Sequence, residues 1–393
     1  MSKVDVAIVG GGIVGGTLAC ALAPHMRVTL IDPRATASDA RRVSAITRAS
    51  RRILERIGVW SRIAQNAIHP LRRMHIGDAR GSGQLSFDAA DVAQTELGYI
   101  VENRAIETAI AAQLELVPNL TRASHALSAF TTHADGALVR LADGTQLEAR
   151  LVVGADGVHS TTRTLAGIAL DGASYDQAAI VCEIRTERAH AGAAFQRFLP
   201  TGPLAFLPLD DNRSSIVWSA DAAFAQTLMA LDDARFAARL SEASARALGE
   251  VLEAGPRLSF PLGHTRAREY ARARLALCGD AAHSIHPLAG QGLNLGLLDV
   301  ASLAEVVRAA ADARRDIGAL ATLRRYERWR KGDNLAMFAV TDGLKRLFQA
   351  QGAWLAWGRN RGFDAVDRIP PLKRLLISRA MGLRGDLPRL ARP

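Results

Sequence analysis

Residues 4–32 read VDVAIVGGGIVGGTLACALAPHMRVTLID and contain the pattern that decides the fold. The apolar run at residues 4–9 predicts a short buried strand, and a second strand is expected at residues 27–31. A glycine-rich turn and a helix-like segment at residues 17–23 separate these two strands. The turn fits G-x-G-x-x-G, with its glycines at Gly10, Gly12 and Gly15. The sequence therefore predicts a β-α-β unit of a Rossmann-like α/β fold.

This unit has the features of a dinucleotide site. The glycines let the backbone approach a pyrophosphate, which the helix N-terminus attracts. Asp32 ends the second strand, 17 residues after Gly15 (32 − 15), where an acidic side chain accepts a hydrogen bond from a ribose hydroxyl. A glycine-rich turn in another kind of β-α unit is the alternative interpretation.

A second glycine-rich loop lies late in the chain. Residues 277–283, LCGDAAH, predict a buried strand that ends in a tight turn, and residues 286–299 read HPLAGQGLNLGLLD. Gly290, Gly292 and Gly296 permit close backbone approach, and the leucines that follow Gly292 predict the start of a helix. Such a loop is suited to an anion, because unpaired N–H groups and the helix dipole point outward there.

A third motif lies in the middle of the chain. Residues 151–153 predict a short buried strand, which runs directly into GADGVHSTTR at residues 154–163. Together, the three motifs resemble the fingerprints of the single-component flavoprotein aromatic hydroxylases. The last stretch is similar to the signature of the ubiquinone-biosynthesis hydroxylases, the UbiH/UbiF/UbiI/Coq6 group. The resemblance covers most of the chain.

The resemblance implies an α/β fold like that of p-hydroxybenzoate hydroxylase. A discontinuous Rossmann-like FAD-binding domain would carry an inserted, mostly antiparallel β-sheet substrate domain and a C-terminal helical region. The expected boundaries are 1–70, 97–172 and 265–325 for the FAD-binding domain, 71–96 and 173–264 for the substrate domain, and 326–393 for the C-terminal helical region.

The resemblance also assigns roles to residues. Asp280 is expected at the ribityl chain of FAD, and the helix beyond Gly292 would direct its positive end at the flavin ring. Arg42 and Arg104 are expected at the phosphates or the ribityl chain, with a surface role equally open. The full set of expected cofactor-binding residues is Gly10, Gly12, Gly15, Asp32, Arg42, Arg104, Asp156, Asp280, Gly290, Gln291, Gly292, Leu293 and Asn294.

Two residues of the middle motif have two interpretations each. In the family, Asp156 and Arg163 match residues linked to the handling of both FAD and NADPH. Stabilisation of the turn is an equally good local explanation, because Asp-Gly is a common turn pair. No second G-x-G-x-x-G offers a separate nucleotide domain, so NAD(P)H is expected to bind transiently as the electron donor. A redox-protein donor is the alternative.

The chemistry that the resemblance implies is hydroxylation of a polyprenylated phenol in ubiquinone synthesis. Oxygen would react with reduced flavin to a C4a-hydroperoxide, which must be shielded from water. We therefore expect an apolar pocket between the flavin and a sheet formed by residues 178–261. His286, Pro287 and Leu288 are the candidates for its wall, and none of them is a certain acid or base. His286 would relay a phenolic proton or be purely structural.

Two other functions compete with this one. A hydroxylase of small soluble aromatic compounds would need a polar pocket with an arginine for a substrate carboxylate. A non-catalytic flavin-binding member of a biosynthetic assembly would use FAD only to stabilise its fold. The complete set of flavin motifs argues against the second of these.

Composition sets further bounds. Hydrophobic residues form 49% and charged residues 22% of the 393 residues, as is usual in a globular protein. No apolar run approaches the roughly 18–20 residues that span a bilayer, and the first strand begins almost at once, so we expect a cytoplasmic protein. Cys20, Cys182 and Cys278 lie in apolar stretches without a CxxC pair, which favours buried thiols. No ligand cluster supports a metal site.

The net charge of +10 suggests an acidic partner. Nucleic acid is not expected, because aromatic residues form only 5% of the chain and no basic stripe is interleaved with them. From Gly352 onward, arginines alternate with Trp354, Trp357 and several leucines. This pattern is typical of a helix that lies peripherally on a membrane, here its inner face, or of one that packs on its own core. Contact with other ubiquinone-pathway enzymes is a family expectation.

Overall fold

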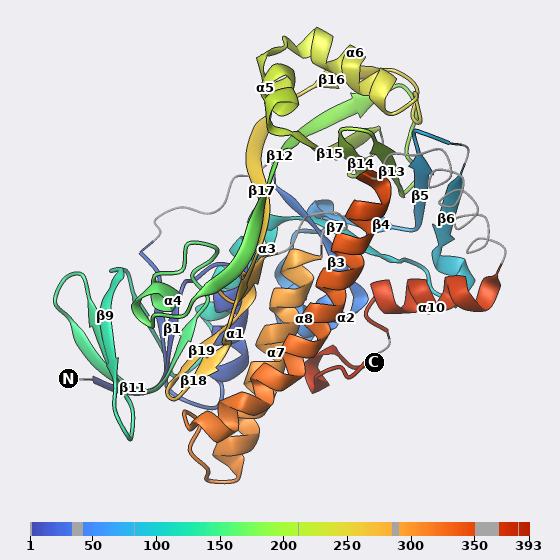
Figure 1. The fold of residues 1–393 in the computed structure, drawn as a ribbon. Coiled ribbons are helices and arrows are strands. Elements are labelled where there is room, and N and C mark those ends of the chain that lie inside the picture. The colour runs from blue at the N-terminus through green and yellow to red at the C-terminus, as the bar shows by residue number, and fades with distance from the viewer. Residues whose placement is uncertain are drawn as a thin grey trace.

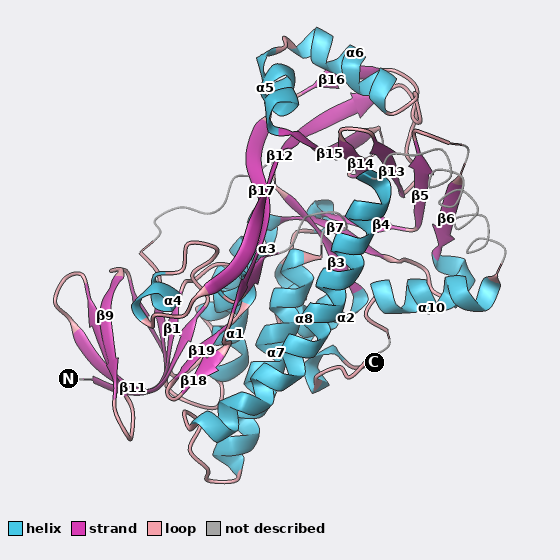
Figure 2. Cartoon of the chain, viewed as in Figure 1, coloured by secondary structure: helices cyan, strands magenta, loops and turns pink. Residues whose placement is uncertain are grey.

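The fold is taken from a computed structural model that describes residues 2–33, 42–81, 83–210, 212–284, 291–349, 369–383 and 385–393. It contains a mixed sheet with a parallel centre, a large antiparallel sheet and a small three-stranded sheet (Figures 1 and 2). The α/β organisation expected from the sequence is confirmed. No helix in these ranges is both long and apolar enough to cross a membrane.

The first sheet has the strand order β18-β19-β11-β1-β2-β8, and β19 through β8 run parallel. Val6, Ile8 and Ile31 are fully buried, because a parallel strand is covered on both faces. A hairpin of β9 and β10 extends the sheet beside β11. The strands are β1 (Ser2–Val9), β2 (Val28–Ile31), β8 (Leu120–Ala123), β9 (Leu127–Thr132), β10 (Ala137–Leu141), β11 (Gln146–Gly154), β18 (Ala271–Arg272) and β19 (Leu275–Leu277).

Helix α1 is the centre of the packing beside this sheet. Nine of its ten residues are buried, and it contacts α3 and α7. Contact with α7 is close because Gly296 has no side chain: a Cβ there would lie 2.9 Å from a methyl of Val14. The helices of this part are α1 (Ile13–Leu22), α2 (Arg48–Arg56), α3 (Asn103–Leu114), α4 (Thr161–Leu165), α7 (Gly292–Asp312) and α8 (Leu320–Gln349).

The second sheet has the order β20-β17-β12-β15-β14-β13-β5-β6, with β16 paired to β12. Its strands are antiparallel to one another except for β13 and β5. The strands are β5 (Arg73–Asp78), β6 (Gln84–Asp88), β12 (Leu170–Thr186), β13 (Ala193–Leu199), β14 (Gly202–Pro208), β15 (Arg213–Asp221), β16 (Val251–Ala254), β17 (Leu258–Ala267) and β20 (His283–Ser284).

Helices α5 (Ala222–Ala230) and α6 (Asp233–Ala243) cover one face of the second sheet, at the top of Figure 1. A separate hydrophobic core lies between them and the sheet. Its largest side chains are Trp218 and Phe236, whose ring centroids are 6.3 Å apart. The opposite face of this sheet looks toward β4 and the first sheet.

The small sheet consists of β3 (Val43–Thr47), β7 (Gly98–Glu102) and β4 (Ile68–Leu71), all antiparallel. In the sequence this small sheet connects to the second sheet twice: the chain passes from β4 into β5, and from β6 back to β7. Residues 73–88 thus lie on the second sheet, with the strands that follow residue 170. Helix α8 continues through residue 326, so the expected boundary at that residue falls inside a helix. The division into domains stays a proposal.

The end of the chain returns to the helices beside the first sheet. Helix α10 (Pro370–Ala380) is followed by a turn whose Met381 carbonyl accepts a hydrogen bond from Ala49 N–H. The final residues run past α2 and α7, where Arg389 N–H donates to Glu305 at 2.7 Å. Figure 1 shows α10 at the edge of the molecule, apart from the α7 and α8 pair.

The second core predicts the effect of one substitution. We expect Phe236→Ala to lower the free energy of unfolding by about 3–5 kcal/mol, because the ring is fully buried beside Trp218 and leaves a cavity. Urea denaturation followed by tryptophan fluorescence measures this loss. Arg235→Ala is the control, since that neighbouring side chain is 79% exposed. A loss in Phe236→Ala no larger than in the control would contradict the described packing.

Candidate functional site

Four parallel strands end at the same level and define one edge of the first sheet. The last residue of β1, Val9, is paired with Ile31 at the end of β2 and with Gly154 at the end of β11. Gly154 is in turn paired with Leu277 at the end of β19. The residue that follows each strand therefore emerges at the carboxyl edge. These residues are Gly10, Asp32, Ala155 and Cys278. Ligands of open α/β sheets bind outside the carboxyl ends of the strands, so the three sequence motifs meet where a ligand is expected.

The first glycine turn is tightly closed. Gly10 has φ +98°, and a Cβ at Gly15 would lie 1.8 Å from the Gly10 carbonyl oxygen. A Cβ at Gly11 would lie 2.4 Å from a carboxylate oxygen of Asp32, so that acid lies directly against the turn. Helix α1 begins after Gly12 with no side-chain cap and no acidic residue in its first turn. Its positive end is thus left for an external anion.

Asp280 lies beside this turn. It follows Gly279, whose backbone has φ +60° and contacts Val14 in the first turn of α1. The Asp280 carboxylate reaches solvent, yet protein surrounds it closely enough that burial raises its pKa, against the lowering effect of His283 and Arg42. A carboxylate in such a recess can accept hydrogen bonds from hydroxyl groups of a ligand.

The two arginines expected at the cofactor lie near this recess. The Arg42 guanidinium is 5.1 Å from the centre of the Phe260 ring, so it joins the first motif region to the second sheet. Its carbonyl accepts a hydrogen bond from Asn103 N–H at 2.9 Å, which places Arg104 close by on the first turn of α3. Both arginine side chains are exposed.

Asp156 and Arg163 are both engaged within the protein. Asp156 accepts hydrogen bonds from the Ser160 hydroxyl at 2.5 Å and from the Thr162 N–H and hydroxyl at 2.9 Å. Arg163 is buried and donates to the carbonyls of Ala281 at 2.9 Å and Val158 at 2.9 Å. These contacts hold the start of α4 and join it to the Asp280 turn. The turn-stabilising interpretation therefore accounts for every described contact of Arg163.

Helix α7 brings the late motif to the same edge. Its N-cap is Gln291, and neither a side-chain cap nor an acidic residue neutralises its first turn. A Cβ added at Gly292 would meet no atom within 4 Å, so this position borders open space. Leu293 packs at the rim of the main core. His286, Pro287, Leu288 and Gly290 lie outside the described residues.

The Asn294 side chain serves the protein itself. It is buried, donates to the Ala45 carbonyl at 2.7 Å and accepts from Thr47 N–H at 3.0 Å. These two hydrogen bonds to backbone groups of β3 attach α7 to that strand. The expected role of Asn294 at the cofactor stays a prediction, and its backbone lies in the first turn of the helix.

A buried ionic network lies directly beneath this edge. The Asp299 carboxylate is fully buried and accepts from Gly279 N–H at 3.0 Å, from His283 Nε2 at 2.5 Å and from Arg330 Nε at 2.9 Å. Burial alone raises the pKa of Asp299, but His283 and Arg330 outweigh it and hold the pKa below its ordinary value. Asp299 thereby fixes the Asp280 turn to α7 and α8.

The second sheet turns a face with a largely apolar patch toward this site. Ala179, Val181, Ala205 and Val217 share the face opposite α5 and α6, as the register of β12, β14 and β15 shows. Ser219 lies opposite Ala179 on this face, and Glu183 and Ser215 follow further along it. The cationic residues on this face of β12 and β15 are Arg185 and Arg213, which lie at its far end. They are paired with Glu253 and Glu183. A substrate bound near the first sheet would therefore meet small side chains, mostly apolar, with the Ser219 hydroxyl among them.

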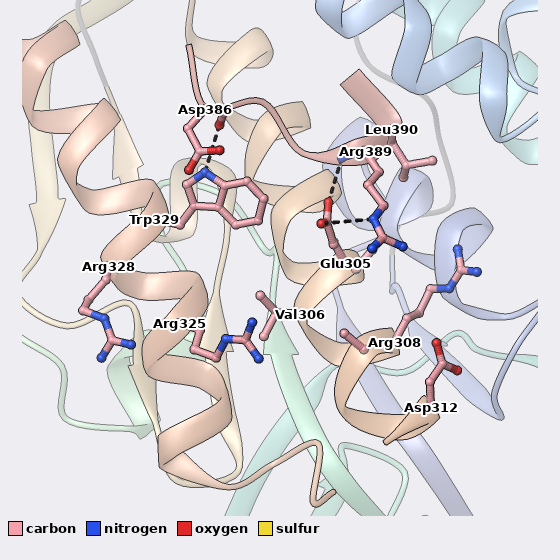
Figure 3. A pocket seen from close by; sticks show the side chains of 12 residues that line it. Glu305, Val306, Arg308, Asp312, Arg325, Arg328, Trp329, Asp386, Arg389 and Leu390 are labelled. Atoms are coloured by element: carbon pink, nitrogen blue, oxygen red, sulfur yellow. Dashed lines mark hydrogen bonds and ion pairs between the residues drawn. The ribbon is translucent and has the colours of Figure 1, made fainter. Parts of the chain in front are cut away.

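A cavity among the described residues lies elsewhere. About 630 Å³ in volume, it lies between the second half of α7, α8 and the C-terminal segment. Figure 3 shows Arg325 beneath Trp329, which donates to the Asp386 carbonyl, and Glu305 paired with Arg389. Its nearest α7 residue, Ala304, is 12 positions and about 18 Å from Gly292. This cavity is separate from the candidate site.

Comparison with known proteins identifies the family. A family model described as an FAD binding domain matches residues 3–332. Ubiquinone hydroxylase UbiL of Rhodospirillum rubrum is 44% identical over 99% of this chain and 92% of its own length. The 3-demethoxyubiquinol 3-hydroxylase of Escherichia coli is 37% identical over 96% of this chain and 98% of its own. The chain belongs to the FAD-dependent ubiquinone-biosynthesis hydroxylase family.

The fold of this hydroxylase family is also found in solved structures. The p-nitrophenol 4-monooxygenase PnpA from Pseudomonas putida superimposes with a TM-score of 0.79 over 97% of this chain and 99% of PnpA, at 20% identity. At that identity the likeness concerns the fold alone. The expected p-hydroxybenzoate hydroxylase-like architecture is confirmed.

The sequence motifs of this hydroxylase do not predict the ion pairs of Asp299. His283 and Asp299 both lie in or beside the quoted motifs, but Arg330 is 31 residues further along, on a helix with no motif of its own. One feature of the sequence could have indicated such a network, namely a charged residue inside an apolar helix. Asp299 follows Leu297 and Leu298 and precedes Val300, where a lone carboxylate requires a partner.

The network predicts a pH-dependent stability. We expect Asp299→Asn to lower the free energy of unfolding by about 3–5 kcal/mol at neutral pH, because Arg330 is left buried without its carboxylate. The pKa of Asp299 is lower in the folded protein than in the unfolded chain, where it is about 3.9. The ionised carboxylate therefore stabilises the folded protein above about pH 3.9, and this stabilisation is lost as the pH falls through the pKa of the folded state. Urea titrations from neutral to acidic pH measure both effects.

The matched control is Asp312→Asn, an exposed position on the same helix. The control should keep the stability and the acid sensitivity of the parent protein. The variant Asp299→Asn should lose part of that acid sensitivity. Identical pH profiles for Asp299→Asn and the parent would show that the carboxylate is not ionised in the folded protein.

Proposed function

We propose that this protein is an FAD-dependent monooxygenase that hydroxylates the aromatic ring of a polyprenylated phenol in ubiquinone biosynthesis. The observation that carries the proposal is the convergence of two uncapped helix N-termini, α1 and α7, with Asp32 and Asp280 at one sheet edge. FAD is elongated, with a ribose at one end, a pyrophosphate and ribityl chain in the middle, and a flavin ring that becomes anionic on reduction. The family match over residues 3–332 supports the same cofactor.

The residues present fit FAD. Asp32 lies against the glycine turn, where it would accept from the adenosine ribose, and the α1 N-terminus would face the pyrophosphate. Asp280, in its recess, would accept from the ribityl hydroxyls, with Arg42 beside it. The open space at Gly292 gives a flat ring access to the α7 N-terminus without a side chain in the way.

Bound FAD would supply the redox chemistry that activates O2 for transfer to the ring. NAD(P)H is the proposed electron donor, as is usual in the family. The protein's own contribution is electrostatic and steric. The positive end of α7 would favour the negative charge of the reduced ring, and the Asp299 network would hold that helix against the Asp280 turn. The apolar face of β12, β14 and β15 would exclude water.

The same face supports a lipophilic substrate over a small soluble aromatic acid. A carboxylate on the substrate would call for an arginine of its own, whereas Arg185 and Arg213 are paired and distant. Arg42, beside Phe260, is the arginine proposed for FAD. The relatives act, by their names, on ubiquinone or demethoxyubiquinol. A polyprenylated phenol resides in the bilayer, so the proposal includes peripheral contact with the inner face of the membrane through the C-terminal region.

Gly292→Val tests the cofactor seat. Since a Cβ there meets no protein atom within 4 Å, we expect a folded variant whose new methyl groups occupy the space of the flavin. Its FAD content, read from the visible absorbance of the purified protein, should fall, and the Kd for added FAD should rise at least about tenfold, which corresponds to a loss of roughly 1.4 kcal/mol in binding. Gly332→Val is the matched control, because that α8 glycine also borders open space.

The control should keep its FAD. Undiminished flavin in Gly292→Val, with the parent yellow, would refute the placement of the ring beside α7. A parent protein that binds no flavin under any reconstitution condition would refute the flavoprotein assignment altogether.

Deletion of the gene tests the pathway. We expect ubiquinone to fall and a less hydroxylated prenylated precursor to accumulate, because the ring cannot be oxidised without this enzyme. Mass spectrometry of extracted quinones measures both, and a plasmid copy encoding the Gly292→Val variant separates catalysis from a scaffold role. An unchanged quinone profile in the deletion strain would contradict the proposal, and full rescue by a flavin-free variant would favour the non-catalytic alternative.

A further inference from the structure

Helix α10 carries the largest local concentration of exposed apolar side chains among the described residues. Ten large hydrophobic residues are exposed in those ranges, and four of them lie within eight consecutive positions. The four are Ile369 at 46%, Leu372 at 38%, Leu375 at 38% and Leu376 at 40% exposure. Scattered exposed leucines are ordinary on protein surfaces, but a cluster of this kind marks an interaction site.

The four residues form one stripe. At about 100° per residue, positions 372, 375 and 376 fall within an arc of roughly 100° on the helix, and Ile369 is the N-cap residue just before it. The side of α10 next to this arc faces the protein: Ile377 is buried, and Lys373 pairs with Asp91 at 3.2 Å. A helix of a globular protein normally turns its leucines inward and its lysine outward. In α10 this arrangement is reversed.

The charges around the stripe have one sign. Helix α10 contains Lys373, Arg374 and Arg379 and no acidic residue. Arg374 and Arg379 are exposed, and Arg379 falls within the apolar arc, where its aliphatic stem can lie along the leucines while its guanidinium reaches outward. The whole chain carries +10. An exposed apolar stripe among cations is the pattern of a helix that lies in the interface of an anionic bilayer.

The position of α10 connects this surface to the second sheet. The helix packs on the turn Ala89–Val92, which directly follows β6, and the Lys373 to Asp91 pair belongs to that contact. At its other end, Met381 is bonded to Ala49 at the start of α2. Figure 1 shows α10 next to the β5 and β6 end of the sheet. A surface that receives α10 would thus also receive this edge of the proposed substrate-binding sheet.

We propose that the outward stripe of α10, Ile369, Leu372, Leu375 and Leu376 with Arg379, is the membrane-docking surface of this protein and inserts into the headgroup region of an anionic bilayer. Arg374, on another side of the helix, adds positive charge close to that surface. The inference rests on the proposed function for its purpose, because a prenylated phenol must be collected from the bilayer. Its physical basis is independent of the chemistry. Charge complementarity selects the bilayer over a second copy of this chain, since two α10 stripes would bring like charges together.

Vesicle sedimentation of the full-length, FAD-loaded protein tests the surface. The vesicles contain phosphatidylcholine and phosphatidylglycerol in equal parts, and pure phosphatidylcholine vesicles serve as the neutral comparison. We expect binding to the anionic vesicles that weakens with added salt. The double variant L372S/L376S should lower the partition coefficient by roughly tenfold or more, because two inserted leucines are lost.

Two control pairs match the variants. L116S/L252S removes two leucines that are 62% and 50% exposed elsewhere and should bind like the parent protein. R374Q/R379Q should weaken binding to anionic vesicles, whereas R235Q/R239Q removes the same charge from α6 and should have little effect. The comparison of R374Q/R379Q with R235Q/R239Q separates a local effect of the α10 charges from the effect of net charge.

Several results would overturn the inference. Absence of binding to anionic vesicles by the parent protein is one, and equal binding by L372S/L376S is another. A concentration-dependent dimer that L372S/L376S dissociates would assign the stripe to a second copy. A lower melting temperature of L372S/L376S than of L116S/L252S without vesicles would assign it to another part of this chain.

The test also separates this inference from the proposed function. L372S/L376S should hydroxylate detergent-solubilised substrate at the parent rate and lose turnover only when the substrate is embedded in vesicles. Normal vesicle binding without turnover in either form would contradict the hydroxylase assignment and leave the docking surface intact. Normal turnover of both the detergent-solubilised and the vesicle-embedded substrate by a protein that does not bind vesicles would contradict the docking surface and leave the hydroxylase assignment intact.

Discussion

The site depends on one buried carboxylate. Asp299 accepts from a turn, from the start of β20 and from α8, and it does so with no exposure to solvent. A charge in that position is tolerated only because Arg330 and His283 surround it with donors. The donors, with Gly279 N–H, come from the segment after β19 and from α8, so the carboxylate determines where the Asp280 turn lies relative to the N-terminus of α7. The proposed cofactor seat would therefore depend on a contact that the cofactor itself need not touch.

The same arrangement explains how a single chain builds a seat for an elongated ligand. Parallel strands deliver four loops to one edge, and α1 and α7 start there without capping side chains. Small residues then set the spacing, because Gly279 and Gly296 both close on Val14. Two helix dipoles are brought side by side with their positive ends at the same place. This arrangement is unfavourable for the protein alone and becomes favourable when an anion is bound.

The glycine turn, Asp32 and the α/β order follow from local patterns, because a strand, a tight turn and a helix each have a signature in adjacent residues. Other features require contacts between distant segments. Asn294 lies in the late motif, yet its amide is bonded to β3, some 250 positions earlier. The partner of Asp299 is on a helix without a motif. The outward direction of the α10 leucines reverses the usual helical pattern, so amphipathicity alone could not decide between a membrane surface and packing on the protein's own core.

One further consequence comes from β12 and β17. These strands pair from Leu170 to Val181 and run from beside the parallel sheet to the core beneath α5 and α6. The only interruption of their pairing is a register shift between Ser174 and Gln177. A hydrogen-bonded ribbon of this length is stiff, so the apolar wall and the cofactor edge are held at a fixed spacing.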